Sequence, residues 1–246
     1  MQVSGTLGAV RTYNESMMHR IGLALALIAW VMTSGVWAQQ KQEDAERLDR
    51  VAVVLQEIMD SPDKGIPQEL LNKSHCAVVV PGLKKGAFIF GAKYGRGFLS
   101  CRKRDGVGWT GPAAVRIEGG SFGLQLGGTE TDVILLVMNE GGAQRLLSSK
   151  FTLGGDATVA AGPVGRSATA QTDAFMTAEI LSWSRSRGLF AGVSLQGATL
   201  RQDLDVNRRL YGKRLENRQI IEGELPSPEP AKRFIDVLNK HSSRKS

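Results

Sequence analysis

Glycine scattered among short β-branched and aromatic runs is the feature that most restricts how this chain can fold. The chain carries 29 glycines in 246 residues, well above the ~7% that is usual in soluble proteins. From Cys76 onward they lie at the ends of strand-like segments and inside them, where glycine marks bulges, bends or close backbone approach. The pattern predicts an α+β fold, mainly an antiparallel, curled or barrel-like β-sheet with a few packing helices.

Composition and turn residues place the strands. Pro81-Gly82 is expected to close the first strand as a turn, and 168–184 is expected to be one long strand with two different faces. The expected strands are residues 77–80, 87–91, 97–101, 114–117, 121–126, 132–138, 151–154, 157–161, 168–184 and 189–198.

Helical periodicity appears before the strands, between them and after them. Near the N-terminus an apolar stripe repeats at spacings of three and four residues. We favour packing of this stripe against the sheet; a membrane interface is the alternative, although the acidic residues beside the stripe oppose an anionic surface. The stripe comprises Ala45, Leu48, Ala52, Leu55 and Met59. Shorter helices are expected from Pro67, from Asn139, from Asp203 or Asp205 to about Tyr211, and at the C-terminus, where Ala231, Phe234, Ile235 and Leu238 share a face.

The first 38 residues have the composition of a secretory signal peptide. Arg11, His19 and Arg20 precede an unbroken apolar run at 21–32, and small residues lead to an expected cleavage after Ala38. We therefore expect a signal peptide at 1–38, one domain at 39–225, and a proline spacer with a C-terminal helix and basic tail at 226–246. An uncleaved anchor is the alternative. Cleavage implies export to a periplasm or to the exterior.

Basic residues recur beside glycine on what the sequence suggests are turns. The formal net charge is +7, which favours anionic surfaces such as membranes but falls short of a nucleic-acid-binding tail. Any one charged turn is usually an ordinary solvated turn, but five together predict a basic rim that binds phosphate groups. The candidate residues are Lys84, Lys85, Lys93, Arg96, Arg102, Lys103, Arg104, Arg166, Arg185 and Arg187.

Catalytic and metal-binding patterns are weak. Residues 119–123 match G-x-S-x-G around Ser121, but the following residues alternate like a strand, whereas a nucleophile elbow needs a helix there. After the expected cleavage only His75 and His241 remain, and there is no Cys-x-x-Cys. We expect neither an enzyme nor a cofactor or metal site.

Two cysteines, Cys76 and Cys101, lie in expected strands. Export would permit a disulfide between them, and the even count is consistent with one. Two small buried thiols would fit the same positions. Only the separation of their Cα atoms decides between these alternatives.

Glycine-rich and aromatic motifs follow one another in order between about Ala45 and Ile221. They are Ile66-Pro67-x-x-Leu70-Leu71, 81–88, Gly106-x-Gly108-Trp109-x-Gly111-Pro112, 119–125, Gly154-x-Asp156-Ala157, 161–166, 186–193 and Tyr211-Gly212. This ordered series resembles the SYLF domain family. The resemblance implies a lipid-binding module: eukaryotic relatives bind phosphoinositides, some yeast relatives bind and bundle actin, and bacterial members are typically lone exported domains. The expected partners are therefore anionic lipids at a membrane surface, with an envelope protein-interaction or structural role as the alternative. The sequence carries no signal for an oligomeric state.

Overall fold

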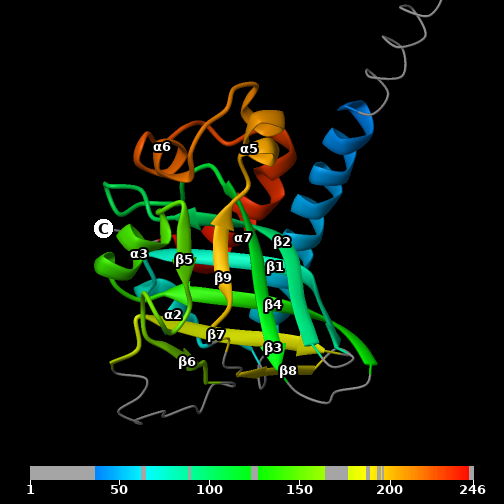
Figure 1. Ribbon diagram of the computed structural model, residues 1–246. Helices are drawn as coiled ribbons and strands as arrows, with labels where there is room; N and C mark the ends of the chain where they lie inside the picture. The colour runs from blue at the N-terminus through cyan, green and yellow to red at the C-terminus, as the bar shows by residue number, and fades with distance from the viewer. Residues whose placement is uncertain are drawn as a thin grey trace, which may run out of the picture. The chain divides into compact units, whose positions relative to one another are not determined.

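The computed structural model describes residues 37–61, 65–87, 90–122, 127–163, 177–186, 189–192, 195 and 197–243. The chain divides into two compact units, Met1–Glu43 and Asp44–Ser246, and every described strand belongs to the second (Figure 1). Residues 1–36 of the expected signal peptide lie outside the described residues, so its cleavage stays a prediction. Among the described residues, no helix is both long and apolar enough to cross a bilayer.

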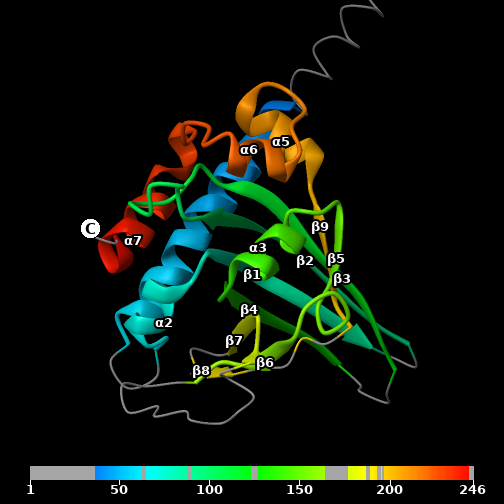
Figure 2. The same cartoon turned by 90° about the vertical axis from the view of Figure 1, so that its left-hand side faces the viewer.

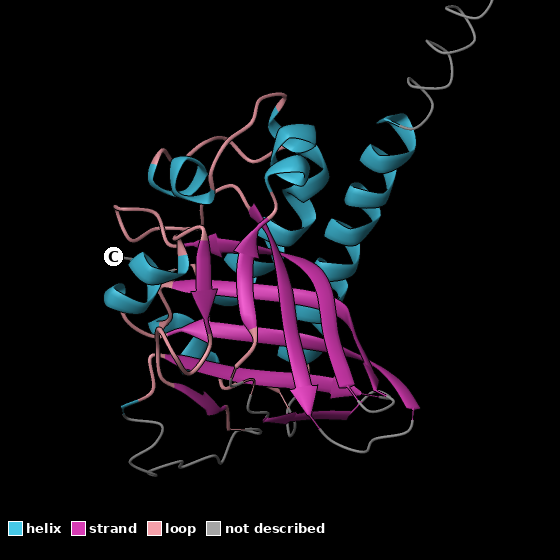
Figure 3. Ribbon diagram, viewed as in Figure 1, coloured by secondary structure: helices cyan, strands magenta, loops and turns pink. Residues whose placement is uncertain are grey.

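Nine strands of the described residues form one sheet in the order β5-β9-β3-β2-β1-β4-β7-β6, and β8 pairs with β7. All neighbours pair antiparallel except β6 and β7. Figure 3 shows that the sheet curls, so that β5 and β9 cross steeply over β4 and β7. The strands are β1 (Cys76–Ala87), β2 (Phe90–Cys101), β3 (Ala113–Phe122), β4 (Gly127–Val137), β5 (Lys150–Thr152), β6 (Val159–Ala161), β7 (Ile180–Ser186), β8 (Leu189–Gly192) and β9 (Thr199–Gln202).

The predicted α+β fold with a curled, mainly antiparallel sheet is confirmed. A helix over residues 37–59 precedes the sheet, and short helices lie between and after its strands. They are α2 (Gln68–Lys73), α3 (Glu140–Leu146), α5 (Leu204–Tyr211), α6 (Asn217–Glu222), the 3-10 turn η1 (Glu229–Ala231) and α7 (Lys232–Ser242).

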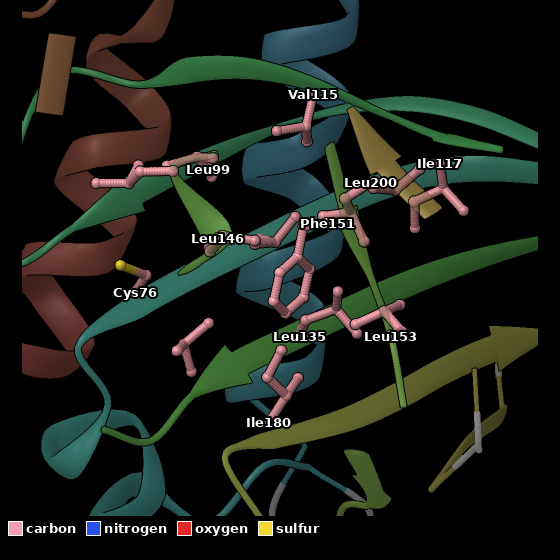
Figure 4. Close-up of a cluster of buried hydrophobic side chains, with 14 of the residues drawn as sticks. Cys76, Leu99, Val115, Ile117, Leu135, Leu146, Phe151, Leu153, Ile180 and Leu200 are labelled. Carbon is pink, nitrogen blue, oxygen red and sulfur yellow. The ribbon is translucent and has the colours of Figure 1, made fainter. Parts of the chain in front are cut away.

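The inner face of the curl holds one apolar cluster. Phe151 of β5 and Leu200 of β9 fold over side chains such as Leu135 of β4 and Leu99 of β2 (Figure 4). Each of these four side chains is at most 2% exposed, and burying a side chain of this size contributes about 1.5–3 kcal/mol. We call the sheet surface that carries this cluster the inner face.

The opposite surface of the sheet, here the helix face, is covered by helices. Leu48 and Leu55 of the N-terminal helix pack with Phe234 and Leu238 of α7 in a second apolar cluster, and all four are fully buried. Figure 2 shows the N-terminal helix and α7 on the same side of the sheet. The apolar stripe of the N-terminal helix therefore serves as core, as predicted. The C-terminal helix also forms as predicted, and it belongs to the same compact unit as the sheet.

Pro81-Gly82 does not form the predicted turn. β1 continues through both residues, and its register with β2 and β4 shifts between Val80 and Leu83, which is a β-bulge. Gly82 has φ +62, a left-handed conformation that glycine adopts without strain. Its N–H donates to Asp132 Oδ1 at 2.9 Å. A turn-forming dipeptide is thus absorbed as a bulge because β1 is paired on both sides.

Other element boundaries also differ from the predictions. Strand β7 begins at Ile180 rather than 168, since residue 177 is helical, and 164–176 lie outside the described residues. Residues 114–117 and the start of 121–126 belong to one strand, β3. Helix α6 was not predicted; the side chains of Glu216 and Gln219 form a capping box at its start.

Buried asparagine side chains bind the backbone of β3 at Ala114, just beyond the residues of β3 that pair with β9. Asn207 of α5 accepts a hydrogen bond from Ala114 N–H at 2.8 Å and donates to Leu215 O at 3.0 Å and to Asn217 Oδ1 at 2.8 Å. Asn217 Nδ2 in turn donates to Ala114 O. Both asparagines are at most 1% exposed. This network fixes α5 and α6 to the edge of β3, because a buried backbone group left without a partner is costly.

Candidate functional site

The structure places several residues of the predicted basic rim inside strands. Because β1 continues through its bulge, Lys84 and Lys85 lie inside a strand rather than on a turn, and Lys93 and Arg96 lie inside β2. The prediction that these residues sit on turns is therefore wrong. Arg166 and Arg187 lie outside the described residues.

Three of the arginines bind groups within the fold. Arg102 stacks on the Trp109 ring at 4.0 Å from its centroid and donates to Leu71 O at 3.0 Å. Arg104 donates to the carbonyl oxygen of Glu222 at 2.7 Å. Arg185 forms an ion pair with Asp132 at 2.7 Å and another with Glu57. These guanidinium groups join distant segments, which is a structural role.

Arg96 occupies an intermediate position. Its Nε lies 3.3 Å from the buried carboxylate of Asp203, which also caps α5, and its guanidinium lies 5.9 Å from the Tyr94 ring centroid. The Arg96 side chain is 41% exposed. It therefore neutralises a buried carboxylate while leaving part of its own surface in solvent.

The lysines differ from the arginines. Among the described residues, no carboxylate lies within ion-pair distance of Lys84, Lys85, Lys93 or Lys103. Lys103 lies on the exposed turn before Gly106, far along β2 from the other three. Lys84, Lys85 and Lys93 lie near one another, toward the end of β1 and the start of β2. We call these three residues the lysine end.

Register fixes the geometry of the lysine end. Lys85 is directly opposite Lys93 on β2, and Lys84 is directly opposite Tyr94 on β2 and Glu130 on β4. Lys85 and Lys93 are half-buried, whereas Lys84 is exposed and Tyr94 is 45% exposed. Burial, and then the charge of Lys93, lower the pKa of Lys85 below its ordinary value. Two ammonium groups thus face each other without a compensating anion among the described residues.

Sequence reasoning missed a second row of cations. Arg96, Arg116, Arg201 and Lys150 lie directly opposite one another across β2, β3, β9 and β5. Glu118 partly neutralises the row, since its carboxylate pairs with Arg116 at 2.6 Å and with Arg201 at 3.1 Å. The row is invisible without the strand register, because its members are far apart in sequence.

Cys76 and Cys101 form a disulfide with an S–S distance of 2.01 Å. The two residues are directly opposite in the β1–β2 ladder, with their Cα atoms 3.9 Å apart. The alternative of two separate thiols, which the sequence left open, does not describe this structure. The bond ties β1 to β2 at the end opposite the lysine end.

The residues considered for catalysis are dispersed. Ser121 lies within β3, paired with Gly91 on β2, and is not at a strand-to-helix turn. His75 lies just before β1, with its N–H donating to Val137 O at 2.7 Å, and His241 lies in α7 near Asp60. Within the described part of the chain, no group of three His, Cys, Asp or Glu side chains is placed to hold a metal ion.

Comparison with known proteins gives the family. The profile described as "Ysc84: Las17-binding protein actin regulator" matches residues 118–241. The chain belongs to the Ysc84 family. This confirms the resemblance to the SYLF domain. The Ysc84 profile begins in β3 and runs through α7, so the lysine end of β1 and β2 precedes the matched region.

Several known proteins are similar to this chain over most of its length. "SH3 domain-containing protein PJ696.02" of Schizosaccharomyces pombe is 35% identical over 177 residues, covering 71% of this chain and 41% of that protein. "SH3 domain-containing YSC84-like protein 1" of Rattus norvegicus is 31% identical, covering 75% and 54%. "Protein YSC84" of Saccharomyces cerevisiae is 32% identical, covering 73% and 39%. The chain spans about half or less of the length of these relatives.

Proposed function

We propose that this protein is a non-enzymatic binding module that attaches peripherally to membranes containing anionic lipids. The observation that carries the proposal is the lysine end: three ammonium groups without carboxylate partners among the described residues, beside an exposed Tyr94. Lysine attracts anionic headgroups, and tyrosine suits the interface because its ring is apolar and its hydroxyl is polar. We further propose that residues 1–38 are a cleaved signal peptide and that the membrane is met in the periplasm or outside the cell.

The strength of attachment follows from the number of lysines. One lysine near an anionic surface contributes about 1 kcal/mol. The three lysines together contribute about 3 kcal/mol, or roughly a hundredfold in affinity. The interaction weakens with salt, because the screening length falls from about 10 Å at 0.1 M to about 3 Å at 1 M.

Vesicle sedimentation tests this proposal. The protein is mixed with vesicles of phosphatidylcholine alone or with a third of phosphatidylglycerol, at low and high salt. We expect binding only to the anionic vesicles, and roughly a hundredfold weaker binding for the variant Lys84→Gln, Lys85→Gln, Lys93→Gln. The matched control removes three exposed lysines elsewhere: Lys213→Gln, Lys232→Gln, Lys240→Gln.

The outcomes separate three interpretations. A loss confined to the lysine-end variant supports the proposal. Equal losses in both variants mean that net charge, and not this end of the sheet, drives attachment. Failure of the unaltered protein to bind anionic vesicles at low salt refutes membrane attachment itself.

A protein partner is the second candidate function. Relatives carry the names "LAS seventeen-binding protein 3" and "Protein YSC84", and the row formed by Arg96, Arg116, Arg201 and Lys150 offers cations to an acidic partner. Affinity capture with the unaltered protein and with Arg116→Gln, Arg201→Gln as baits tests this. A partner retained by the lysine-end variant but lost from the arginine variant supports it. Retention by both contradicts a role for the row.

A further inference from the structure

The lysine end includes a part that points into the curl of the sheet. Leu83 belongs to the inner apolar cluster, and side chains alternate along a strand, so Lys85 also lies on the inner face. A Cβ added to Gly95 would lie 2.8 Å from the Leu83 side chain. Positions 95 and 93 of β2 are therefore on the inner face as well. Lys85 and Lys93 form an inner lysine pair, directly opposite each other.

Charges of the opposite sign lie on the other side of the sheet. Val133 of β4 and Ile117 of β3 belong to the inner cluster, so the alternate residues Glu130, Asp132 and Glu118 lie on the helix face. Directly opposed like charges destabilise a sheet. The inner lysine pair is therefore unfavourable in the protein alone, and a bound anion would relieve it.

Thr131 adds a hydrogen-bonding group to the same place. It pairs with Leu83 in the β1–β4 ladder and lies on the inner face, one diagonal step from Lys85. Thr131 is 9% exposed, and its hydroxyl oxygen is buried without a hydrogen-bond partner among the described residues. A buried hydroxyl without a partner is unfavourable, because it has given up its hydrogen bonds to water. Buried polar groups are otherwise hydrogen-bonded in native proteins, so this hydroxyl is available to bind a ligand.

The spacing suits a small oxyanion. Directly opposite Cβ atoms in a sheet are about 4.5–5.5 Å apart and diagonal ones about 7–8 Å. A tetrahedral oxyanion that accepts hydrogen bonds of about 2.8 Å spans these distances. Thr129, directly opposite Lys85 on β4, provides a second hydroxyl on the same face.

We infer that Lys85, Lys93 and Thr131 form a discrete binding site for one phosphate group on the inner face of the sheet. The two ammonium groups pair with the phosphate oxygens, and the Thr131 hydroxyl donates to one of them. The inference extends the proposed function, on which it rests for the source of the ligand, from diffuse attraction to a stoichiometric site. The phosphate belongs either to a lipid headgroup or to a soluble phosphate ester.

Calorimetric titration of the full chain with inorganic phosphate tests the site directly. We expect saturable one-to-one binding that weakens about tenfold or more in Lys85→Gln and in Lys93→Gln. Thr131→Val removes one charge-assisted hydrogen bond without altering net charge, and should weaken binding by about tenfold. The matched control is Lys213→Gln, which removes the same charge from an exposed lysine after α5 and should change affinity less than twofold. Melting curves confirm that each variant is folded.

Vesicles distinguish the two sources of phosphate. Vesicles with phosphatidic acid, which exposes a phosphomonoester, are compared with phosphatidylglycerol vesicles of equal zeta potential. Preference for phosphatidic acid that is lost in Thr131→Val supports a headgroup in the site. Phosphate binding without vesicle binding supports the site and its soluble ligand but refutes the proposed membrane function. Vesicle binding without phosphate binding, or equal loss in Lys213→Gln, overturns the site while leaving the membrane function standing.

Discussion

Replacing Thr131 by valine should stabilise the unliganded protein, which is an unusual expectation for a buried substitution. The Thr131 hydroxyl has no hydrogen-bond partner among the described residues, so its removal eliminates a desolvation cost of about 1–3 kcal/mol. Valine has nearly the same shape and places a methyl group where the hydroxyl was. We expect the free energy of unfolding to rise by about 1–2 kcal/mol, which is about 2–8 °C in Tm for a domain of this size.

The measurement is urea unfolding in a phosphate-free buffer, with the m-value compared between variants to confirm the same unfolding transition. Thr110→Val is the matched control, because Thr110 is also buried but its hydroxyl oxygen accepts a hydrogen bond from Cys101 N–H at 3.2 Å. Thr110→Val should therefore destabilise by about 1–3 kcal/mol, since Cys101 N–H loses its partner. The same substitution is thus expected to act with opposite signs at the two sites.

Added phosphate should make the unaltered protein more stable than Thr131→Val, which is the reverse of the order expected without phosphate. A ligand at a hundred times its Kd stabilises the native state by about 2.7 kcal/mol, and the unaltered protein would gain more of this than Thr131→Val. If Thr131→Val destabilises as much as Thr110→Val in phosphate-free buffer, the Thr131 hydroxyl is satisfied in the folded protein. The inner face then has no free hydroxyl at Thr131 to donate to a ligand.

Three further predictions concern stability. Asn207→Ala should lower the free energy of unfolding by about 2–4 kcal/mol, because three hydrogen bonds of a buried network are lost; a loss below about 1 kcal/mol in urea unfolding contradicts this. Replacing Cys76 and Cys101 by alanine should cost about 3.5 kcal/mol for a loop with a sequence separation of 25 residues, measured against the unaltered protein without reductant. Burial, and then Lys240, lower the pKa of His241 in the folded protein, so the unfolded chain binds a proton first and stability falls as pH drops below about 6.5. His241→Gln should reduce the difference in Tm between pH 7 and pH 5, and an unchanged difference excludes His241 as its source.

Helix ends were predictable because their signals are local. Asn139 caps α3 by accepting a hydrogen bond from Gly142 N–H at 2.7 Å, and Asp203 caps α5 by accepting from Val206 N–H at 3.4 Å. Gly212, at φ +73, ends α5 as a left-handed residue. In each case the residue that determines the boundary lies within a few positions of the groups it satisfies. The sequence around each helix end therefore contains the residues that determine where the helix begins or ends.

The course of β1 was not predictable for the opposite reason. Pro81-Gly82 has the composition of a turn, and nothing within a few residues indicates otherwise. The chain continues as a strand because Val79 and Lys84 both find partners on β2 and on β4. These partners include residues about 50 positions away, such as Asp132, which accepts the Gly82 N–H. Tertiary pairing overrides a local turn preference here.

The arginines and the lysines of the predicted basic rim have different roles in this fold. Arginine and lysine count equally toward a net charge, but the planar guanidinium group donates several hydrogen bonds in a fixed geometry, whereas the ammonium group is a strongly hydrated point charge. In this fold Arg102, Arg104 and Arg185 bind carbonyl or carboxylate oxygens of distant segments. Lys85 and Lys93 instead have no carboxylate within ion-pair distance among the described residues. Function in this protein should therefore depend on a few lysines placed by strand register, and the number of basic turns in the sequence overestimates the binding surface.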